Sequence, residues 1–469
     1  MEKNDTFINV AAIEKLLADT AKPDRRRAFD VLDRALEKKG LSPEDAAVLL
    51  NNDDPEVTER LFEEAGRVKY EIYGRRLVLF APLYIANYCA NNCLYCAFRR
   101  DNRSVRRHVL SMAEIAEETL RLEQQGHKRL LLLTGEDMVR SGLDYFLEAV
   151  RTVYATKTPD GKGAVRRINV EIAPLDEAGF RRLKAADIGT YVLFQETYHP
   201  ETYARMHPSG PKADYSWRLY AMHRAQAGGI DDVGLGVLLG LHTDYRFEAL
   251  GMLEHARRLE RDCGVGPHTL SVPRLEPALN APAAQQPPHP ISDHNFKRLV
   301  AILRLAVPYT GIILSTRERP ELRNELFALG ISQISAGSRT NPGGYGTKGD
   351  DQATAQQFAL GDTRSLEEVI QAVCAAGYLP SFCTGCYRQG RTGQDFMELA
   401  KPGLINRFCL PNAILTFAEY LMDYAGPETQ AAGRRVIQAQ LDEISDASRR
   451  SETIQRLNEM QGGQRDLYF

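Results

Sequence analysis

Two kinds of hydrophobic pattern divide the chain. Residues 1–75 place their apolar positions three and four apart, and this spacing predicts amphipathic helices. Ser42 directly precedes the segment PEDAAVLL, whose first turn is acidic, and is the expected N-cap of one of these helices. We therefore expect an all-helical N-terminal extension over residues 1–75.

From residue 76 onward the pattern changes to short apolar runs, each followed by an amphipathic segment. The eight runs are 76–85, 129–134, 168–173, 190–195, 233–242, 268–274, 311–316 and 333–338. Nearly continuous apolar strands that alternate with helices indicate a parallel sheet buried on both faces. Eight units predict an α/β fold of the (β/α)8 TIM-barrel type over residues 76–338, with a doubly wound open sheet as the alternative.

The remaining residues, 339–469, contain helical patterns and no convincing strand, which predicts a helical C-terminal domain. Two long connections interrupt the regular pattern. The stretch 275–292 is rich in proline, and the stretch 338–357 is polar and rich in glycine. Both are expected to be loops.

Charge and composition exclude several classes of protein. The 469 residues include 59 Lys and Arg against 62 Asp and Glu, a net charge of −3, which provides no basic field for nonspecific nucleic-acid binding. The start has no signal-peptide pattern, and no apolar run approaches the roughly 18 residues of a membrane helix. We expect a soluble, cytoplasmic protein that binds neither nucleic acid nor membranes. The one arginine-rich stretch, with Arg99, Arg100, Arg103, Arg106 and Arg107, has only Phe98 as an aromatic neighbour and is expected to be a solvated approach to a helix rather than an RNA site.

Cysteine spacing carries the strongest chemical signal. Six of the eight cysteines form two triplets, at 89, 93 and 96 and at 383, 386 and 409. A large chain without an export signal and with such close spacing is unlike a disulfide framework, so metal or cluster ligation is the better interpretation. Cys263 and Cys374 are isolated and are expected to be structural thiols.

Cys89, Cys93 and Cys96 follow the pattern C-x3-C-x2-C in the loop that leaves the first predicted strand. Three thiolates on one loop cover three irons of a four-iron cube and leave the fourth iron open. A zinc knuckle is the alternative, but structural zinc requires a fourth ligand, and the nearest imidazole is His108. In a barrel this loop opens at the catalytic face.

Cys383, Cys386 and Cys409 form a second open triplet, C-x2-C-x22-C. All ten histidines lie at or before His294, so no local imidazole completes a zinc site. A second iron–sulfur cluster with an exposed iron is therefore favoured over structural zinc.

The first triplet, with Tyr95 before its last cysteine, resembles the radical S-adenosylmethionine (SAM) superfamily. The resemblance implies that the open iron of a [4Fe-4S] cluster chelates SAM, and that an electron cleaves SAM to methionine and a 5′-deoxyadenosyl radical. A GGE-like turn of that superfamily is matched by Thr134-Gly135-Glu136, in which Thr replaces the first glycine. The residues expected near SAM are Tyr95, Gly135, Glu136 and Glu171.

The two triplets, joined by the eight-strand pattern, resemble the HydG family of FeFe-hydrogenase maturases over nearly the whole chain. The closely related ThiH family of 2-iminoacetate synthases lacks the second triplet. The resemblance implies a carbon–carbon lyase that cleaves the Cα–Cβ bond of L-tyrosine to p-cresol and dehydroglycine. It further implies that dehydroglycine is converted to CO and cyanide, which a second C-terminal [4Fe-4S] cluster with a labile iron collects as a precursor of the hydrogenase H-cluster.

Other residues are candidates for the substrate and for the labile iron. Arg317, after the seventh strand, is placed to bind a carboxylate with two hydrogen bonds, and its alternative is an ion pair with Glu318. His268 follows a Gly-Pro turn at the start of the sixth strand; alone it suggests a local hydrogen bond, whereas the resemblance makes it a ligand of the labile iron at the far end of the barrel. Strand-end hydroxyls that are either substrate ligands or merely satisfied locally are Ser315, Ser335 and Ser338.

Several functions compete with this interpretation. A ThiH-like synthase for thiamine-thiazole biosynthesis is disfavoured by the second triplet, an RNA-modifying radical SAM enzyme by the charge balance, and a non-catalytic iron–sulfur scaffold by the enclosed barrel. The expected partners are L-tyrosine, an external electron donor of flavodoxin or ferredoxin type, and other hydrogenase maturation proteins.

Overall fold

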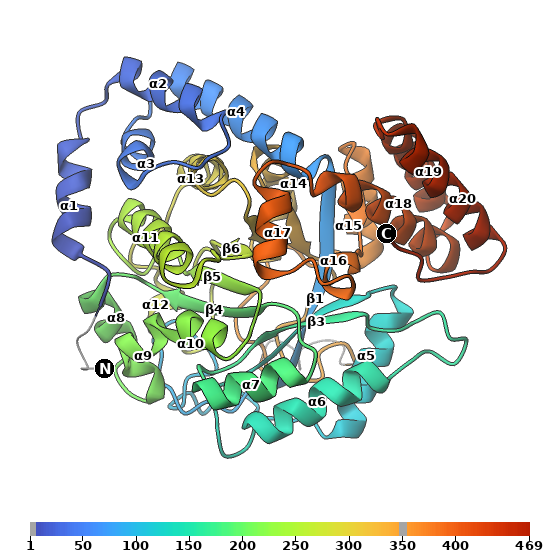
Figure 1. The fold of residues 1–469 in the computed structure, drawn as a ribbon. Helices are drawn as coiled ribbons and strands as arrows, with labels where there is room; N and C mark the ends of the chain where they lie inside the picture. The colour runs from blue at the N-terminus through green and yellow to red at the C-terminus, as the bar shows by residue number, and fades with distance from the viewer. Residues whose placement is uncertain (1–5, 347–353) are drawn as a thin grey trace.

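The N-terminal extension is helical, as predicted. The computed structural model describes residues 6–346 and 354–469. Ser42 is confirmed as an N-cap, because its hydroxyl accepts a hydrogen bond of 3.0 Å from the amide of Asp45. The last helix of the extension, α4 (Pro55–Tyr73), packs against two outer helices of the barrel, α13 (Asp293–Ala306) and α14 (Pro320–Leu329) (Figure 1). The four helices are α1 (Val10–Asp19), α2 (Arg25–Ala35), α3 (Pro43–Leu50) and α4 (Pro55–Tyr73).

Eight parallel strands close into a barrel, which confirms the predicted fold class. The order β2-β3-β4-β5-β6-β7-β8-β1 is completed by pairing of β1 with β2, so the open-sheet alternative is wrong. The first strand is the longest because it runs the full height of the barrel. The strands are β1 (Arg76–Ala86), β2 (Arg129–Thr134), β3 (Arg167–Glu171), β4 (Tyr191–Glu196), β5 (Val233–Val237), β6 (Thr269–Ser271), β7 (Gly311–Leu314) and β8 (Gln333–Ser335).

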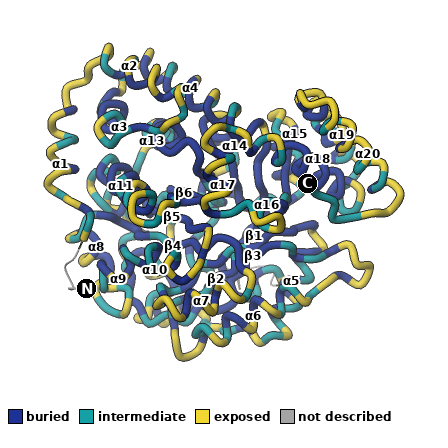
Figure 2. Tube along the Cα trace, viewed as in Figure 1, coloured by how far each residue is buried: buried dark blue, intermediate teal, exposed yellow. Residues whose placement is uncertain are grey.

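Helices between the strands surround the barrel and bury it on all sides. The strands are almost entirely buried, whereas the outer faces of the helices are exposed (Figure 2). The connecting helices are α5 (Met112–Gln124), α6 (Leu143–Ala155), α7 (Glu177–Ala185), α8 (Pro200–Met206), η1 (Pro211–Ala213), α9 (Tyr215–Leu219), α10 (Ala221–Ala227), α11 (Tyr245–Cys263), α12 (Pro282–Gln285), α13 (Asp293–Ala306) and α14 (Pro320–Leu329). None of the helices in the described part of the chain is long and apolar enough to span a membrane.

The C-terminal region lies beside the barrel and contains a strand, so the prediction that it has none is wrong. The strand β9 (Leu379–Ser381) pairs with the first residues of β1, Arg76–Val78, below the point where β2 pairs with that strand. Three residues with a central Pro380 are too short and too weak a pattern for a strand to be expected. The helices are α15 (Leu366–Ala375), α16 (Gly385–Arg388), α17 (Gly393–Ala400), α18 (Asn406–Asp423), α19 (Pro427–Asp442) and α20 (Ala447–Gln461).

One predicted connection differs from expectation. The proline-rich stretch 275–292 contains the short helix α12. The arginine-rich residues 99–108 form turns and irregular segments that precede α5, which begins at Met112, in agreement with the expected approach to a helix. Of the glycine-rich stretch 338–357, residues 347–353 lie outside the described residues.

Candidate active site and candidate metal centre

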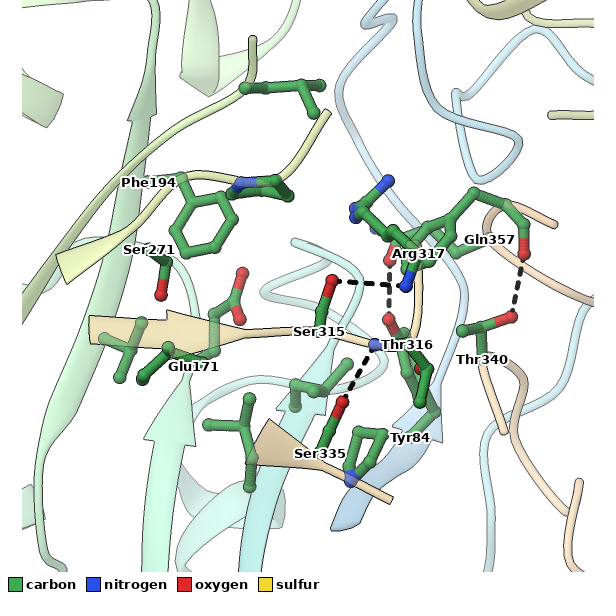
Figure 3. Close-up of a pocket in the computed structure, with 18 of the residues that line it drawn as sticks. Tyr84, Glu171, Phe194, Ser271, Ser315, Thr316, Arg317, Ser335, Thr340 and Gln357 are labelled. Carbon is green, nitrogen blue, oxygen red and sulfur yellow. Dashed lines mark hydrogen bonds between the residues drawn. The ribbon is translucent and has the colours of Figure 1, made fainter. Parts of the chain in front are cut away.

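A cavity of about 140 Å³ opens at the carboxyl ends of the barrel strands. Inward side chains alternate along each strand, so every second residue of β1 from Phe80 to Tyr84 faces it. Figure 3 shows polar side chains of several strands meeting around this space. The polar and charged lining residues are Tyr84, Tyr95, Asn169, Glu171, Glu196, Ser271, Ser315, Thr316, Arg317, Ser335, Thr340 and Gln357.

The first cysteine triplet lies at the rim of this upper cavity. Cys96 lines it, and the amide of Gln357 donates a hydrogen bond to the Cys96 sulfur over 3.5 Å. None of the described cysteines forms a disulfide. Burial raises the pKa of Cys89 to about 11 and raises that of Cys93 further, so without a metal these thiols keep their protons, and ligation would release them.

The donor set of the loop fits an iron–sulfur cluster better than a single ion. Within the described residues, no three His, Cys, Asp or Glu side chains are grouped so as to hold one metal ion. A four-iron cluster does not need three side chains around a single metal ion, because each thiolate binds a different iron. Three free, largely buried thiols on one loop therefore suit a cluster with one open iron.

Gly135 and Glu136 hold the cysteine loop in place. The Gly135 amide donates to the carbonyl of Ala86, and a side chain on Gly135 would come within 2.2 Å of the carbonyl oxygen of Tyr88. The Glu136 carbonyl accepts from the amide of Ala90, the residue after Cys89. Both residues lie beside the triplet, as expected, but neither lines the upper cavity.

The Glu136 carboxylate belongs to a buried ion network. It lies 2.9 Å from the Arg218 guanidinium and accepts from the amide of Asn91 at 2.7 Å. Arg218 also forms an ion pair with Glu196, and the Glu196 carboxylate pairs with Lys212 at 2.6 Å. Glu196 has a backbone φ of +71° at an irregularity between β4 and β5, and this strained conformation points its carboxylate to the cavity.

Tyr95 and Glu171 both face the upper cavity. The Tyr95 hydroxyl is hydrogen-bonded to Nε2 of His207 at 2.7 Å. Glu171 is the last residue of β3, and its side chain points into the barrel. Burial, together with the nearby Glu196, raises the pKa of Glu171 to about 7.

Three of the four residues predicted to bind substrate are brought together. Arg317 lies in the cavity with its guanidinium 3.3 Å from the ring centre of Phe358. The hydroxyl of Ser315 accepts from the amide of Arg317, and that of Ser335 accepts from the amide of Thr316. Ser338 is not a lining residue; it is buried, and its hydroxyl makes no hydrogen bond within the described chain.

The expected alternative for Arg317, a surface ion pair with Glu318, is wrong. Glu318 is 2 % exposed and pairs with Arg274. Arg317 therefore has no carboxylate partner among the described residues and faces the cavity with its hydrogen-bond donors available. A guanidinium in this position suits an anionic ligand.

Sequence reasoning missed several cavity residues. Asn169 is two residues before Glu171 on β3, and Ser271 ends β6. Their orientation follows from strand alternation once the register is known. Strand alternation does not predict the other two residues. Glu196 reaches the cavity through a backbone irregularity, and Gln357 lies on a long loop that returns to the barrel mouth.

A second, smaller cavity of about 50 Å³ lies at the opposite end of the barrel. Cys383, Cys386 and Cys409 line it together with His268, which directly precedes β6. The amide of Gly385 donates to the Cys383 sulfur at 3.3 Å, and Cys386 and Cys409 share a hydrogen bond. The second triplet and His268 therefore meet although 115 residues separate His268 from Cys383.

The environment of His268 leaves a ligating nitrogen available. Its Nδ1 lies 3.5 Å from Asp232 and makes no hydrogen bond to the described residues. Burial lowers the pKa of His268, which keeps the ring neutral. Three free thiols and a neutral imidazole fit a metal cluster with one further metal ion. Arginine side chains that line the same cavity can compensate the negative charge of a ligated cluster; they are Arg76, Arg129 and Arg391.

Comparisons with known proteins agree with this geometry. Residues 83–254 match the radical SAM superfamily, and residues 271–379 match the biotin and thiamin synthesis associated domain. The chain is 34 % identical to 2-iminoacetate synthase of Escherichia coli over 358 residues, 76 % of this chain and 90 % of that protein.

Solved structures of HydG are similar over nearly the whole chain. A crystal structure of HydG, described as a maturase of the [FeFe]-hydrogenase, has a TM-score of 0.95 at 50 % identity and covers 99 % of this chain and 100 % of its own. HydG from Carboxydothermus hydrogenoformans has a TM-score of 0.83 at 41 % identity and covers 96 % of this chain and 98 % of its own.

The barrel, the cysteine loop at its mouth and these matches define a radical SAM enzyme. Within that class, the chain belongs to the family of HydG maturases and 2-iminoacetate synthases.

Proposed function

We propose that the protein is a radical SAM lyase that cleaves the Cα–Cβ bond of L-tyrosine to p-cresol and dehydroglycine. It then forms CO and cyanide, which leave as an iron carbonyl–cyanide precursor for assembly of the FeFe-hydrogenase H-cluster with other maturation proteins. One observation carries the proposal: at one end of a single barrel a cavity is bordered by the first cysteine triplet through Cys96, and at the opposite end a cavity is lined by the whole second triplet.

The upper cavity supports the lyase step. Cys89, Cys93 and Cys96 would hold a [4Fe-4S] cluster, which with bound SAM supplies the radical that starts the reaction. Arg317 would bind the substrate carboxylate, with the hydroxyls of Ser315 and Ser335 beside it. The surrounding barrel excludes water from a reactive intermediate.

Tyr95, Gly135, Glu136 and Glu171 would serve SAM in two ways. Tyr95 and Glu171 reach the cavity and can contact the cofactor. Gly135 and Glu136 would act on the cysteine loop through their backbone hydrogen bonds. The ion pair of Glu136 with Arg218 fixes that loop against the barrel interior.

The lower cavity supports chemistry on diatomic products. Cys383, Cys386 and Cys409 would hold the second [4Fe-4S] cluster, and His268 would bind the labile iron that leaves with the product. Arg76 and Arg129 favour an anion such as cyanide in this cavity. Ser338, buried and outside both linings, has no part in the proposal.

A product assay tests the proposal. Anaerobically reconstituted protein given SAM, dithionite and tyrosine should release p-cresol, 5′-deoxyadenosine, CO and cyanide. Formation of 5′-deoxyadenosine without p-cresol would refute the tyrosine-lyase function.

A ThiH-like synthase that stops at dehydroglycine is the second candidate, because 2-iminoacetate synthase of Escherichia coli shares 34 % identity. It predicts p-cresol without CO in the wild-type protein. The second triplet and the agreement with HydG over 99 % of the chain favour the first candidate.

A further inference from the structure

A glutamine on the loop that returns to the barrel mouth contacts a cysteine of the first triplet. The side-chain amide of Gln357 donates to the Cys96 sulfur over 3.5 Å. The orientation of this amide is fixed from the other side, because the Tyr84 hydroxyl donates to its Oε1 at 2.7 Å. With the amide oxygen engaged by Tyr84, the NH2 group faces the sulfur. Tyr84, Gln357 and Cys96 therefore form a chain of two hydrogen bonds.

The backbone of Gln357 is held between two parts of the barrel mouth. Its amide donates to the carbonyl of Thr340 at 2.8 Å, and its carbonyl accepts from the amide of Ala97, the residue after the last cysteine of the triplet, at 3.2 Å. The next residue, Phe358, has its ring centre 3.3 Å from the guanidinium of Arg317. This segment therefore contacts both the cysteine loop and the arginine that faces the upper cavity.

A hydrogen bond to a cluster sulfur stabilises the two oxidation states of the cluster unequally. Reduction adds one negative charge, part of which resides on the ligating thiolates, so a donor to a thiolate stabilises the reduced state more than the oxidised state. The reduction potential rises as a result. Tyr84 is only 5 % exposed, and in such a buried environment water screens the interaction little.

We propose that Gln357 raises the reduction potential of the first cluster through its hydrogen bond to Cys96, and that Tyr84 is the positioning residue that orients its amide. The inference rests on the proposed [4Fe-4S] cluster at the first triplet. In the proposed reaction, one electron from an external donor reduces this cluster and then breaks the bond between the sulfur and the 5′-carbon of SAM, which yields methionine and the 5′-deoxyadenosyl radical. A higher potential makes the first of these transfers easier. Tyr84 lines the upper cavity together with Arg317 (Figure 3), so the chain of hydrogen bonds begins at the proposed substrate site.

Redox titration of the reconstituted holoenzyme tests the proposal. The potential of the first cluster is followed by the electron paramagnetic resonance signal that changes when SAM is added. Gln357→Leu removes the donor and should shift the reduction equilibrium about tenfold toward the oxidised state, which is a potential lower by about 59 mV for one electron. Gln356→Leu makes the same substitution at the neighbouring residue, which does not line the upper cavity, and should leave the potential unchanged.

Two further variants separate this contact from a general change in the loop. Gln357→Glu keeps an acceptor for Tyr84 but has no NH2 group for Cys96, and it should lower the potential at least as far as Gln357→Leu. Tyr84→Phe keeps the amide but removes the hydrogen bond that orients it, and it should lower the potential by a smaller amount.

An unchanged potential in Gln357→Leu would overturn the proposal, as would an equal shift in Gln356→Leu. If Gln357→Leu does not hold the cluster, Gln357→Glu decides by the same criterion, because its side chain has nearly the shape of the wild-type glutamine. Wild-type protein in which SAM changes no cluster signal would instead refute the proposed cluster itself, so the two failures are distinguishable.

Discussion

Gly135 and Arg317 illustrate two ways in which a single residue serves the upper cavity. Gly135 allows the turn after β2 to contact the carbonyl of Tyr88, next to the first cysteine, with no room for a side chain. Arg317 instead presents a guanidinium that no described carboxylate neutralises. Gly135 therefore determines the shape of the cysteine loop, whereas Arg317 would contact the ligand.

We predict that Gly135→Ala disrupts the loop of the first triplet. A methyl group 2.2 Å from the Tyr88 oxygen forces the backbone to move, at a cost of about 1–3 kcal/mol. Iron bound per chain after reconstitution should fall by about half, because only the second triplet remains intact. Gly161→Ala is the control: Gly161 is exposed, its added methyl would meet nothing within 4 Å, and the strain from its φ of +72° stays local to a loop far in sequence from the cysteines. This variant should keep the wild-type iron content, and equal iron in both variants would contradict the assigned role of Gly135.

We predict that Arg317→Lys raises the KM for the amino-acid substrate about tenfold or more, because an ammonium cannot make the paired hydrogen bonds of a guanidinium to a carboxylate. The matched control is Arg319→Lys, an exposed neighbour that pairs with Asp293, and it should leave KM unchanged. Steady-state kinetics of p-cresol release measure both. An unchanged KM in Arg317→Lys would exclude this arginine as the carboxylate ligand.

A pH effect on stability is expected from Glu248, on α11, away from both cavities. Burial raises its pKa to about 7, although Thr197 and the amide of Tyr198 donate hydrogen bonds to it. Between about pH 4.5 and pH 7 the unfolded state ionises and the folded state does not, so the stability contributed by the protonated carboxyl is lost as the pH rises.

Glu248→Gln removes this titration. The melting temperature of the wild type relative to the variant should therefore fall by a few degrees between pH 5 and pH 8, which thermal scans at the two pH values would measure. A difference that does not vary with pH would show that Glu248 does not titrate in this range.

At the scale of elements, β1 is the structural link between the two cavities. Its inward side chains line the lower cavity at Arg76 and Val78 and the upper cavity from Phe80 to Tyr84. Its lower end also pairs with β9, two residues before Cys383. One strand thus contacts both sites, and β9 attaches the second triplet to the barrel.

The helix α18 carries Cys409 and is attached to the barrel by a buried charge cluster. Glu419 is 2 % exposed and pairs with Arg166, which precedes β3, and lies 3.7 Å from Lys128. We predict that Glu419→Gln costs about 1–3 kcal/mol, because Lys128 loses the carboxylate within 4 Å of it while Arg166 keeps its ion pair with Asp466.

Hydrogen exchange should detect this loss as faster exchange in α18–α20 with little change in α5–α7. Glu398→Gln, an exposed residue of α17, serves as the control and should leave exchange unchanged. Uniform acceleration across the barrel would contradict a local attachment role for Glu419.

The sequence predicts repeating features well and isolated contacts poorly. Each of the eight barrel strands begins within one residue of its predicted apolar run, because a run of mostly buried apolar residues is a local signal. The strand ends are less well predicted, since the runs 233–242 and 268–274 extend past β5 and β6. The three-residue β9 was missed because its pairing depends on the free lower edge of β1, which no local pattern reports. In the same way, the strained backbone of Glu196 and the contact of Gln357 with the barrel mouth depend on tertiary structure. Ser338 was a candidate substrate ligand, but it lies three residues past the end of β8 at Ser335 and does not line the cavity.

For the whole molecule, the arrangement places two separate cavities at opposite ends of one barrel. The upper cavity is larger and lies at the strand ends, where barrel enzymes place substrate and catalytic groups. The lower cavity is small, cationic and lined by the second triplet. The proposed function requires that a small product formed in the upper cavity be used in the lower one.

The role of the second triplet in CO formation is tested most directly by the ratio of CO to p-cresol in wild type and in Cys386→Ala. Both proteins would be reconstituted anaerobically and given SAM, dithionite and tyrosine, with Cys374→Ala as a control at a thiol outside both triplets. Cys386→Ala is expected to retain p-cresol and lose CO, whereas Cys374→Ala is expected to retain both. Persistence of both products in Cys386→Ala would contradict this expectation, because the second triplet would then not be the site of CO chemistry.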